Sequence, residues 1–319
     1  MTTRTEIHNQ FKQDARPSLP IEIIERGKRE KEFYDRYSDP SQIPDEVLVV
    51  PKDFENLDMP LEIARLVPSL PGKTVCDYGC GYGLTSAFFA LRGAQTFAFD
   101  VSETNVSIAS RTARVNEVAD RVFLQVAQGE DTGYPKDSFD LIFGKGVLHH
   151  LATAVAAHEM YRILKPGGAA VFFEPFGENK LLEWARRCPL RSSEHRHTRD
   201  ERNILYSDLT VLASCFDRVS FRETGLVTIA KTLCRKVEVG MVAIPRGGRT
   251  LDTLASWDRW IFARLPILRR VAPFVVICMF KEGGMTGAGK VLRELAQGLH
   301  HTRAERPKTD GCLDSHCDA

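Results

Sequence analysis

Nine residues, 75–83, constrain the fold of this chain more than any other segment. They read V-C-D-Y-G-C-G-Y-G: an apolar stretch ends at an acid, and glycines then occupy every second position. Glycine lets the backbone turn sharply and leaves space for a ligand to lie against it. A stretch typical of a helix follows at 84–91. A strand, a glycine loop and a helix in this order indicate the ligand-binding edge of an open α/β sheet.

The alternation of strand and helix continues beyond this segment. Helices are expected at 84–91, 102–118 and 152–164, with Ser102 as the N-cap of the second. The K-P-G-G segment at 165–168 is predicted to end the third helix and to turn the chain into a strand. Such alternation indicates a parallel sheet with helices on both faces. Strands are expected at 74–78, 96–100, 122–127, 139–143, 169–173, 219–222 and 274–280.

Composition argues against several classes of function. Lys and Arg number 43 against 42 Asp and Glu, so the net charge of +1 lacks the basic excess typical of nucleic-acid binding. The longest strongly apolar run, 274–280, is too short to span a membrane, and the first residues lack a signal-peptide core. We therefore expect a cytoplasmic protein with no nucleic-acid partner and no integral membrane segment. The eight cysteines have no zinc-knuckle spacing and indicate free thiols.

Five segments resemble, in order, the motifs of class I S-adenosylmethionine (SAM)-dependent methyltransferases. The resemblance is close over roughly residues 60–176 and looser beyond. It implies a Rossmann-like seven-strand α/β sheet with helices on both faces, an N-terminal helical cover and a helical insertion before the last strand. The segments are V-C-D-Y-G-C-G-Y-G at 75–83, F-A-F-D-V at 97–101, Q-G-E-D at 128–131, S-F-D-L-I-F at 138–143 with V-L-H-H-L at 147–151, and E-M-Y-R-I-L-K-P-G-G at 159–168.

The residue patterns along the chain predict a division into three parts. A helical cover occupies 1–56, and its helix at 21–37 carries Tyr34 and Tyr37, which we expect to close over the site. The methyltransferase domain occupies 57–283 and includes a substrate-covering region at 177–270. A C-terminal helix and a disordered tail are expected at 284–319.

The glycine loop is where the resemblance places the methionine part of SAM. The loop formed by Gly79, Gly81 and Gly83 would let backbone amides meet the cofactor, and Asp77 would compensate its positive charge. Lys145 would line the path beside the methionine tail. An acid in this loop repels a pyrophosphate, which disfavours the rival prediction of an NAD-binding enzyme.

The next two strand ends are where the resemblance places the adenosine. Asp100 would accept both ribose hydroxyls, and Val101 would pack on the adenine. Members of the family commonly have an acid after the third strand, whereas this chain has Gln128. The amide oxygen of Gln128, the backbone amide of Gly129 and the carboxylate of Glu130 remain open as contacts to the adenine.

Three residues are candidates for catalysis. His149 and His150 follow the fourth strand at the ligand edge, where a histidine is the natural base near neutral pH or shapes the pocket. Glu174 ends the fifth strand and either acts on the substrate or anchors a loop. A hydroxyl substrate favours a histidine as the base, and an alkene favours Glu174. No spacing requires a metal ligand set, and no metal is expected.

Together these features predict a SAM-dependent methyltransferase that acts on an oxygen or a carbon of a small-molecule, specialised metabolite. Arginines at 186–199 favour an anionic substrate or simply form a solvated loop, and an apolar substrate also remains open. The alternative is a non-catalytic SAM-binding or partner subunit with the same fold. The sequence leaves the acceptor atom and the oligomeric state undetermined.

Overall fold

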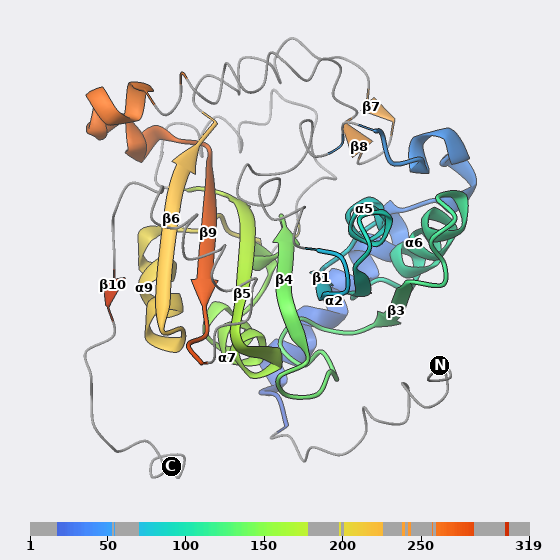
Figure 1. Cartoon of the computed structure of the whole chain (residues 1–319), viewed down its shortest axis with the longest axis horizontal. Helices are drawn as coiled ribbons and strands as arrows, with labels where there is room; N and C mark the ends of the chain where they lie inside the picture. The colour runs from blue at the N-terminus through green and yellow to red at the C-terminus, as the bar shows by residue number, and fades with distance from the viewer. Residues whose placement is uncertain are drawn as a thin grey trace.

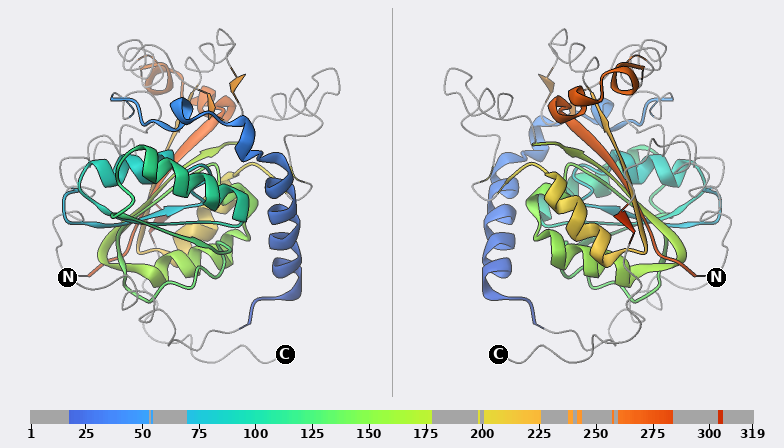
Figure 2. Two further views of the ribbon diagram at one scale, coloured as in Figure 1. Left: turned by 90° about the vertical axis from the view of Figure 1, so that its right-hand side faces the viewer. Right: turned by 90° about the vertical axis from the view of Figure 1, so that its left-hand side faces the viewer.

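A single mixed β-sheet with helices on both faces organises the chain (Figure 1). In Figure 2, the sheet separates α6 on one side from α7 on the other, and α2 stands beside the sheet. The computed structural model describes residues 18–52, 54, 70–177, 198, 201–225, 238–239, 242–243, 257, 260–283 and 304–305.

The described helices match the predicted positions closely. The helix at 21–37 has the predicted bounds, and Ser102 caps α6 by accepting a hydrogen bond from the backbone N–H of Asn105. The α-helices are α2 (Ile21–Tyr37), α5 (Leu84–Leu91), α6 (Glu103–Val115), α7 (Thr153–Ile163) and α9 (Tyr206–Cys215). Short 3-10 helices are η1 (Pro40–Gln42), η2 (Asp45–Leu48), η4 (Leu148–His150) and η5 (Pro266–Val271).

The sheet has the strand order β10-β6-β9-β5-β4-β1-β2-β3. Strands β3, β2, β1, β4 and β5 run parallel, and β9 inserts antiparallel between β5 and β6. The predicted Rossmann-like seven-strand sheet is thereby confirmed. Its strands are β1 (Thr74–Tyr78), β2 (Gln95–Asp100), β3 (Val122–Val126), β4 (Phe139–Lys145), β5 (Leu164–Pro175), β6 (Arg218–Thr224) and β9 (Phe274–Phe280).

Three short strands lie outside the predicted set. β10 (Ala304–Glu305) pairs with the edge strand β6, within the tail that was expected to be disordered. β7 (Glu238–Val239) and β8 (Val242–Ala243) form a separate two-stranded sheet. The remainder of 284–319 lies outside the described residues, and the predicted domain boundaries stay predictions.

The K-P-G-G segment differs from its prediction as a turn ahead of the fifth strand. The helix α7 does end before it, at Ile163, but the segment belongs to β5. Leu164 pairs with Phe139 and Ala169 with Leu141, so the register shifts across the segment. The glycines therefore produce an irregularity inside the strand, and Lys165 secures it by donating to Asp140 at 2.8 Å.

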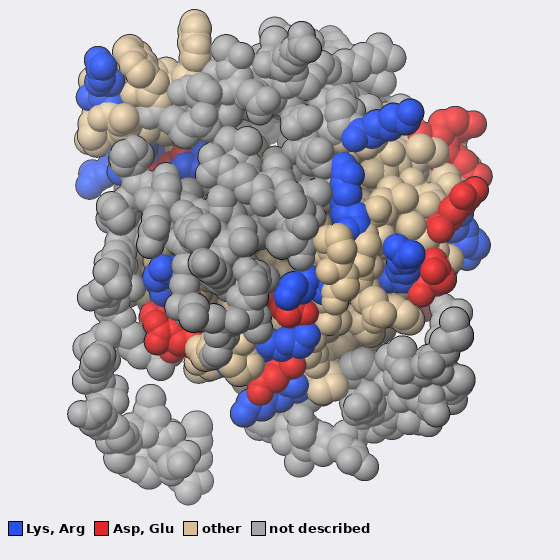
Figure 3. Space-filling model, in the orientation of Figure 1, with Lys and Arg blue, Asp and Glu red and all other residues tan. Residues whose placement is uncertain are grey.

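Alternate residues of β1 pack on opposite faces of the sheet. Cys76 and Tyr78 join an apolar cluster with α7 and α9, whereas Val75 joins a cluster with α5. The helices thereby hold the carboxyl ends of the central strands in fixed positions. On the face shown in Figure 3, acidic and basic side chains of the described residues are interspersed. None of the described helices combines the length and the apolar character required to cross a membrane.

Lys281, just after β9, joins three segments at the base of the sheet. The residue is 7% exposed. Its Nζ donates to the carboxylate of Asp137 at 2.6 Å and to the backbone oxygens of Tyr161 and Leu164 at 2.9 and 2.8 Å. Removing the ammonium would leave these acceptors without their donor, which is costly inside a protein.

We expect Lys281→Met to lower the free energy of unfolding by about 3 kcal/mol, because a partly buried carboxylate and two backbone oxygens lose the ammonium that donates to them. Urea unfolding followed by circular dichroism measures the change. The exposed Lys136 provides a matched control, and Lys136→Met should stay within about 0.5 kcal/mol of the wild type. Equal stability of the two variants would contradict the role given to Lys281.

Candidate functional site

A cavity of about 220 Å³ lies at the carboxyl ends of β1, β2, β3 and β4. The loops that follow these strands line one wall, and residues of α2, the helix that stands beside the sheet in Figure 2, line the other. All the predicted cofactor-binding residues except Gly83 line it: Asp77, Gly79, Gly81, Asp100, Val101, Gln128, Gly129, Glu130 and Lys145. Among the predicted catalytic residues, only His150 lines it.

The glycines of the loop after β1 have different structural roles. A Cβ on Gly79 would lie 2.4 Å from the side chain of Val147, so glycine allows the loop after β4 to approach. Gly83 does not line the cavity. It begins α5 with φ of 76°, and a Cβ there would lie 2.7 Å from that of Ala109 on α6. Gly83 therefore allows α5 and α6 to pack closely.

Asp100 is fixed in place by donors from two segments. Its Oδ2 accepts from the backbone N–H of Gly81 at 2.9 Å. Its Oδ1 accepts from the backbone of Ser102 at 3.0 Å and from the side chain of Asn105 at 3.1 Å. Burial nevertheless raises the pKa of Asp100. The carboxylate thus links the glycine loop to the start of α6 and retains a fixed orientation at the cavity wall.

Asp77 is a second buried carboxyl group at the same cavity. It is 3% exposed and accepts a hydrogen bond from Ser86 at 2.5 Å. Burial raises the pKa of Asp77 to about 7, and the nearby Asp100 adds to the rise. A cation in the cavity would lower that pKa, because an adjacent opposite charge favours the ionised form.

The loop after β3 carries Gln128 and Glu130, two of the residues expected to contact the adenine, and their side chains have different partners. The Nε2 of Gln128 donates to the backbone oxygen of Ile23 in α2 at 2.9 Å, so this side chain holds the helix. Glu130 accepts from the backbone of Ala152 through Oε1 at 2.8 Å. Its buried Oε2 has no hydrogen-bond partner among the described residues. An unsatisfied acceptor at a cavity wall points to a donor on a ligand.

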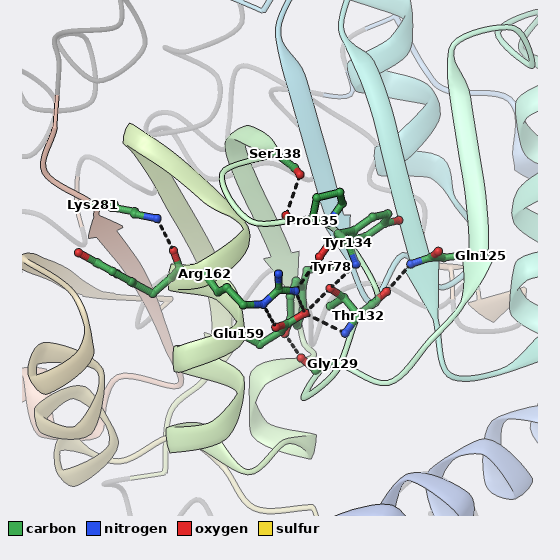
Figure 4. Close-up of polar contacts among 11 residues, drawn as sticks. Tyr78, Gln125, Gly129, Thr132, Tyr134, Pro135, Ser138, Glu159, Arg162 and Lys281 are labelled. Carbon is green, nitrogen blue, oxygen red and sulfur yellow. Dashed lines mark hydrogen bonds and ion pairs between the residues drawn. The ribbon is translucent and has the colours of Figure 1, made fainter. Parts of the chain in front are cut away.

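A polar network beneath this loop explains the E-M-Y-R segment of α7 (Figure 4). Glu159 accepts from the backbone N–H of Thr132 at 3.0 Å and from Nε of Arg162 at 2.7 Å. The hydroxyl of Tyr78 donates to the backbone oxygen of Gly129. Residues that the sequence marked only as a lead into β5 thereby hold the wall that carries Glu130.

Glu174 is an anchor for the loop after β4. It is fully buried, and its Oε1 accepts from the backbone N–H groups of Val147 and Leu148, each at 3.0 Å. Its Oε2 accepts from Nδ1 of His149 at 2.7 Å. Neither Glu174 nor His149 lines the cavity. Of the two roles left open for Glu174, its contacts favour the anchor.

His149 is held as a cation. Burial opposes its charged form, but Glu174 and Glu201 outweigh burial and raise the pKa of His149 to about 9. Near neutral pH the ring therefore carries two protons and has no lone pair for base catalysis. His149 is therefore not suited to act as the base, whereas its neighbour His150 lines the cavity.

His149, His150 and Glu201 bring atoms of metal-ligating type within 4.8 Å of one another. Nδ1 of His149 is engaged by Glu174, and its Nε2 lies 3.5 Å from Glu201. A histidine ligand must be neutral, whereas this one retains its proton. The pairing of the His149 cation with Glu174 and Glu201 therefore explains the cluster. The expectation that the chain binds no metal stays a prediction.

α2 supplies one wall of the cavity through Arg26, Gly27, Glu30 and Tyr34. Tyr34 was expected near the site, but Tyr37 does not line the cavity. Gly27 and Glu30 were not among the residues predicted from the sequence to line the site. Gly27, Glu30 and Tyr34 follow one another at spacings of three and four residues, which places them on one helix face, and that periodicity was the available signal. The arginine-rich segment at 186–199 lies outside the described residues except for Thr198.

Comparison with known proteins agrees with this architecture. Residues 76–172 match the model of the family described as "Methyltransferase domain". The chain is 31% identical over 111 residues to the "Ubiquinone biosynthesis O-methyltransferase" of Alkalilimnicola ehrlichii, covering 34% of this chain and 44% of that protein. It is 30% identical over 108 residues to the "27-O-demethylrifamycin SV methyltransferase" of Amycolatopsis mediterranei, covering 33% and 40%.

The match therefore spans less than half the length of these curated relatives. Among solved structures, geranyl diphosphate C-methyltransferase from Streptomyces coelicolor A3(2) shares the fold, with a TM-score of 0.50 and 14% sequence identity. That likeness covers 84% of this chain and 100% of that chain. Sequence and fold together show that this chain carries a methyltransferase domain of the class I SAM-dependent type.

Proposed function

We propose that this chain binds SAM in the cavity and transfers its methyl group to an oxygen of a small molecule. The observation that carries the proposal is the set of three buried acids, Asp77, Asp100 and Glu130, around one cavity at the carboxyl edge of the sheet. Burying carboxylates is costly unless a partner compensates them. SAM offers a sulfonium, an ammonium and several hydrogen-bond donors, which suit such a wall.

Each part of SAM has a candidate partner. Asp77 and the loop at Gly79 would hold the positively charged methionine part. Asp100, already oriented by backbone amides, would accept the ribose hydroxyls, and Val101 would pack on the adenine. The unsatisfied Oε2 of Glu130 would accept from the adenine amino group. Gln128 donates through Nε2 to α2, and its amide oxygen stays a second candidate acceptor for the same amino group.

The choice between oxygen and carbon as the methyl acceptor depends on which side chain is free to take a proton from the substrate. Bound SAM would supply an electrophilic methyl group, whose bond to sulfur breaks with the electron pair left on sulfur. His150 faces the cavity and can accept the proton that a substrate hydroxyl loses as its oxygen attacks. Glu174, the candidate for an alkene substrate, is occupied by the loop after β4. Oxygen is therefore favoured over carbon, as in the names of the two curated relatives.

Methyl transfer is tested with SAM that carries a labelled methyl group and a panel of phenols, catechols and hydroxylated natural products. We expect S-adenosylhomocysteine and an O-methylated product in equal amounts. His150→Gln should lower kcat by about 100-fold, because it removes the base. His158→Gln changes an exposed histidine of α7 and should retain full activity. SAM binding without S-adenosylhomocysteine from any acceptor would favour the non-catalytic alternative.

SAM binding is also expected to release a proton from Asp77. The pKa of Asp77 is raised to about 7 in the free protein, and the bound cation would lower it. Affinity should therefore increase about tenfold from about pH 6 to about pH 8. Isothermal titration calorimetry in buffers of different ionisation enthalpy measures the released proton.

Asp77→Asn separates this proton from any that the amino group of SAM exchanges. The variant should lose the Asp77 proton from the linkage and bind SAM more weakly. Asp120→Asn, at an exposed acid, should behave as the wild type. The same proton release in the wild type and in Asp77→Asn would refute the role assigned to Asp77.

A further inference from the structure

We propose that Glu30 of α2 is a positioning residue that orients His150 as the base, so that the N-terminal helix completes the reactive site. The inference rests on the proposed function. It assigns a role to a residue that the motifs at the sheet edge do not include. It also explains why a buried acid lies on the inner face of a helix outside the sheet.

The contact between Glu30 and His150 is close and buried. Oε2 of Glu30 lies 3.2 Å from Nδ1 of His150. The two residues are 5% and 9% exposed. Neither of these two atoms has a hydrogen bond to another described residue. Two buried, unpaired atoms of complementary type are therefore available to each other, and a small rotation of either side chain would align them.

The other oxygen of Glu30 is already used. The hydroxyl of Thr198 donates to Oε1, and the backbone N–H of Thr198 donates to Glu201 at 3.3 Å. Thr198 thereby fixes the carboxylate plane and leaves Oε2 facing the imidazole. A carboxylate at Nδ1 keeps the proton on that nitrogen, so the opposite nitrogen retains its lone pair.

That opposite nitrogen faces the cavity. Nε2 of His150 lies 3.2 Å from the hydroxyl of Tyr34, and both residues line the cavity. Burial, helped by the charge of Glu30, raises the pKa of Tyr34, so the phenol stays protonated and donates to Nε2. A substrate hydroxyl in place of this phenol would meet the same lone pair and lose its proton to it.

The titratable groups near His150, other than Glu30 and Tyr34, already have partners of their own. Glu30 and Tyr34 face it from α2, and the ring of His149 lies 4.1 Å away between centroids. His149 is paired with Glu174, and Glu201 lies beside His149. Asp100 is held by backbone amides. Glu30 is thus the carboxylate placed to act on Nδ1 of His150.

A purely structural role for Glu30 would be to attach α2 to the domain. The helix has other attachments that serve this purpose. Gln128 donates to the backbone oxygen of Ile23, and Asp35 accepts from the hydroxyl of Ser102 at 2.6 Å. Ser38 donates to Asn105 at 2.8 Å. Loss of the Glu30 charge should therefore leave α2 in place.

The test is the tautomer of His150, read by ¹⁵N NMR of imidazole-labelled protein in the presence of SAM. The wild type should carry its proton on Nδ1. In Glu30→Gln the amide oxygen would accept from the Thr198 hydroxyl as Oε1 does, so the NH2 group would face Nδ1 and should move the proton to Nε2, whereas Glu30→Asp should retain the wild-type signature. The exposed acid Glu32 of α2 provides the matched control, Glu32→Gln. An unchanged tautomer in Glu30→Gln would overturn the proposal.

Kinetics with labelled SAM and the hydroxyl panel provide the second readout. Glu30→Gln should lower kcat by about 100-fold, as expected when the base holds its proton on the wrong nitrogen. The Kd for SAM should change by less than about threefold. Equal losses of SAM affinity and kcat would indicate a structural role and contradict the proposal. A tautomer switch in a protein that transfers no methyl group would retain the Glu30 assignment and reject the proposed function.

Discussion

The burial of carboxylates at the carboxyl edge of the sheet is the constraint on which the site depends. Each acid is held by donors from a different segment: Asp77 by Ser86 of α5, Asp100 by the glycine loop and the start of α6, and Glu130 by the backbone before α7. Carboxylates in such an environment resist ionisation. A ligand that brings positive charge and hydrogen-bond donors offsets that cost, which is why the cavity suits a sulfonium cofactor.

The two adjacent histidines show how the same residue type acquires two functions. His149 points away from the cavity into a pair of carboxylates and is held as a cation. His150 lines the cavity and lies between an acid and a phenol of α2. The anchor formed by Glu174 sets both directions, because it fixes the backbone at the start of η4. The two histidines look equivalent in the sequence. In the fold, His149 pairs with carboxylates away from the cavity, and His150 is the one placed to act on a substrate.

Local patterns predicted much of the fold because the strands of this sheet are short apolar runs with clear ends. The helix α2, the N-cap Ser102 and the strand β9 lie where the sequence placed them. Local sequence patterns gave wrong predictions where contacts with segments distant in the sequence determine the structure. The K-P-G-G segment lies within β5, where Gly167 and Gly168 exchange backbone hydrogen bonds with Lys281 rather than forming a free turn. Gly83 matched the cofactor loop in sequence, yet its φ and the proximity of Ala109 assign it to helix packing.

The site was less predictable than the fold for the same reason. Glu174 serves a loop 26 residues before it, and Glu30 meets a histidine 120 residues after it, so no local spacing reveals either contact. Gln128 aligned with an adenine contact, and only the folded chain shows that its Nε2 also donates to the backbone of Ile23 in α2. Motifs identified the strand ends that face the ligand. Only the folded chain shows which of the acids at that edge still has an unpaired oxygen.

A crystal structure of the wild-type protein with bound SAM tests the proposed site most directly. We expect the ribose on Asp100, the adenine amino group on Glu130, the methionine part at Asp77, and the methyl group directed toward His150. SAM bound elsewhere, or bound in the cavity with its methyl group away from His150, would contradict the proposed site.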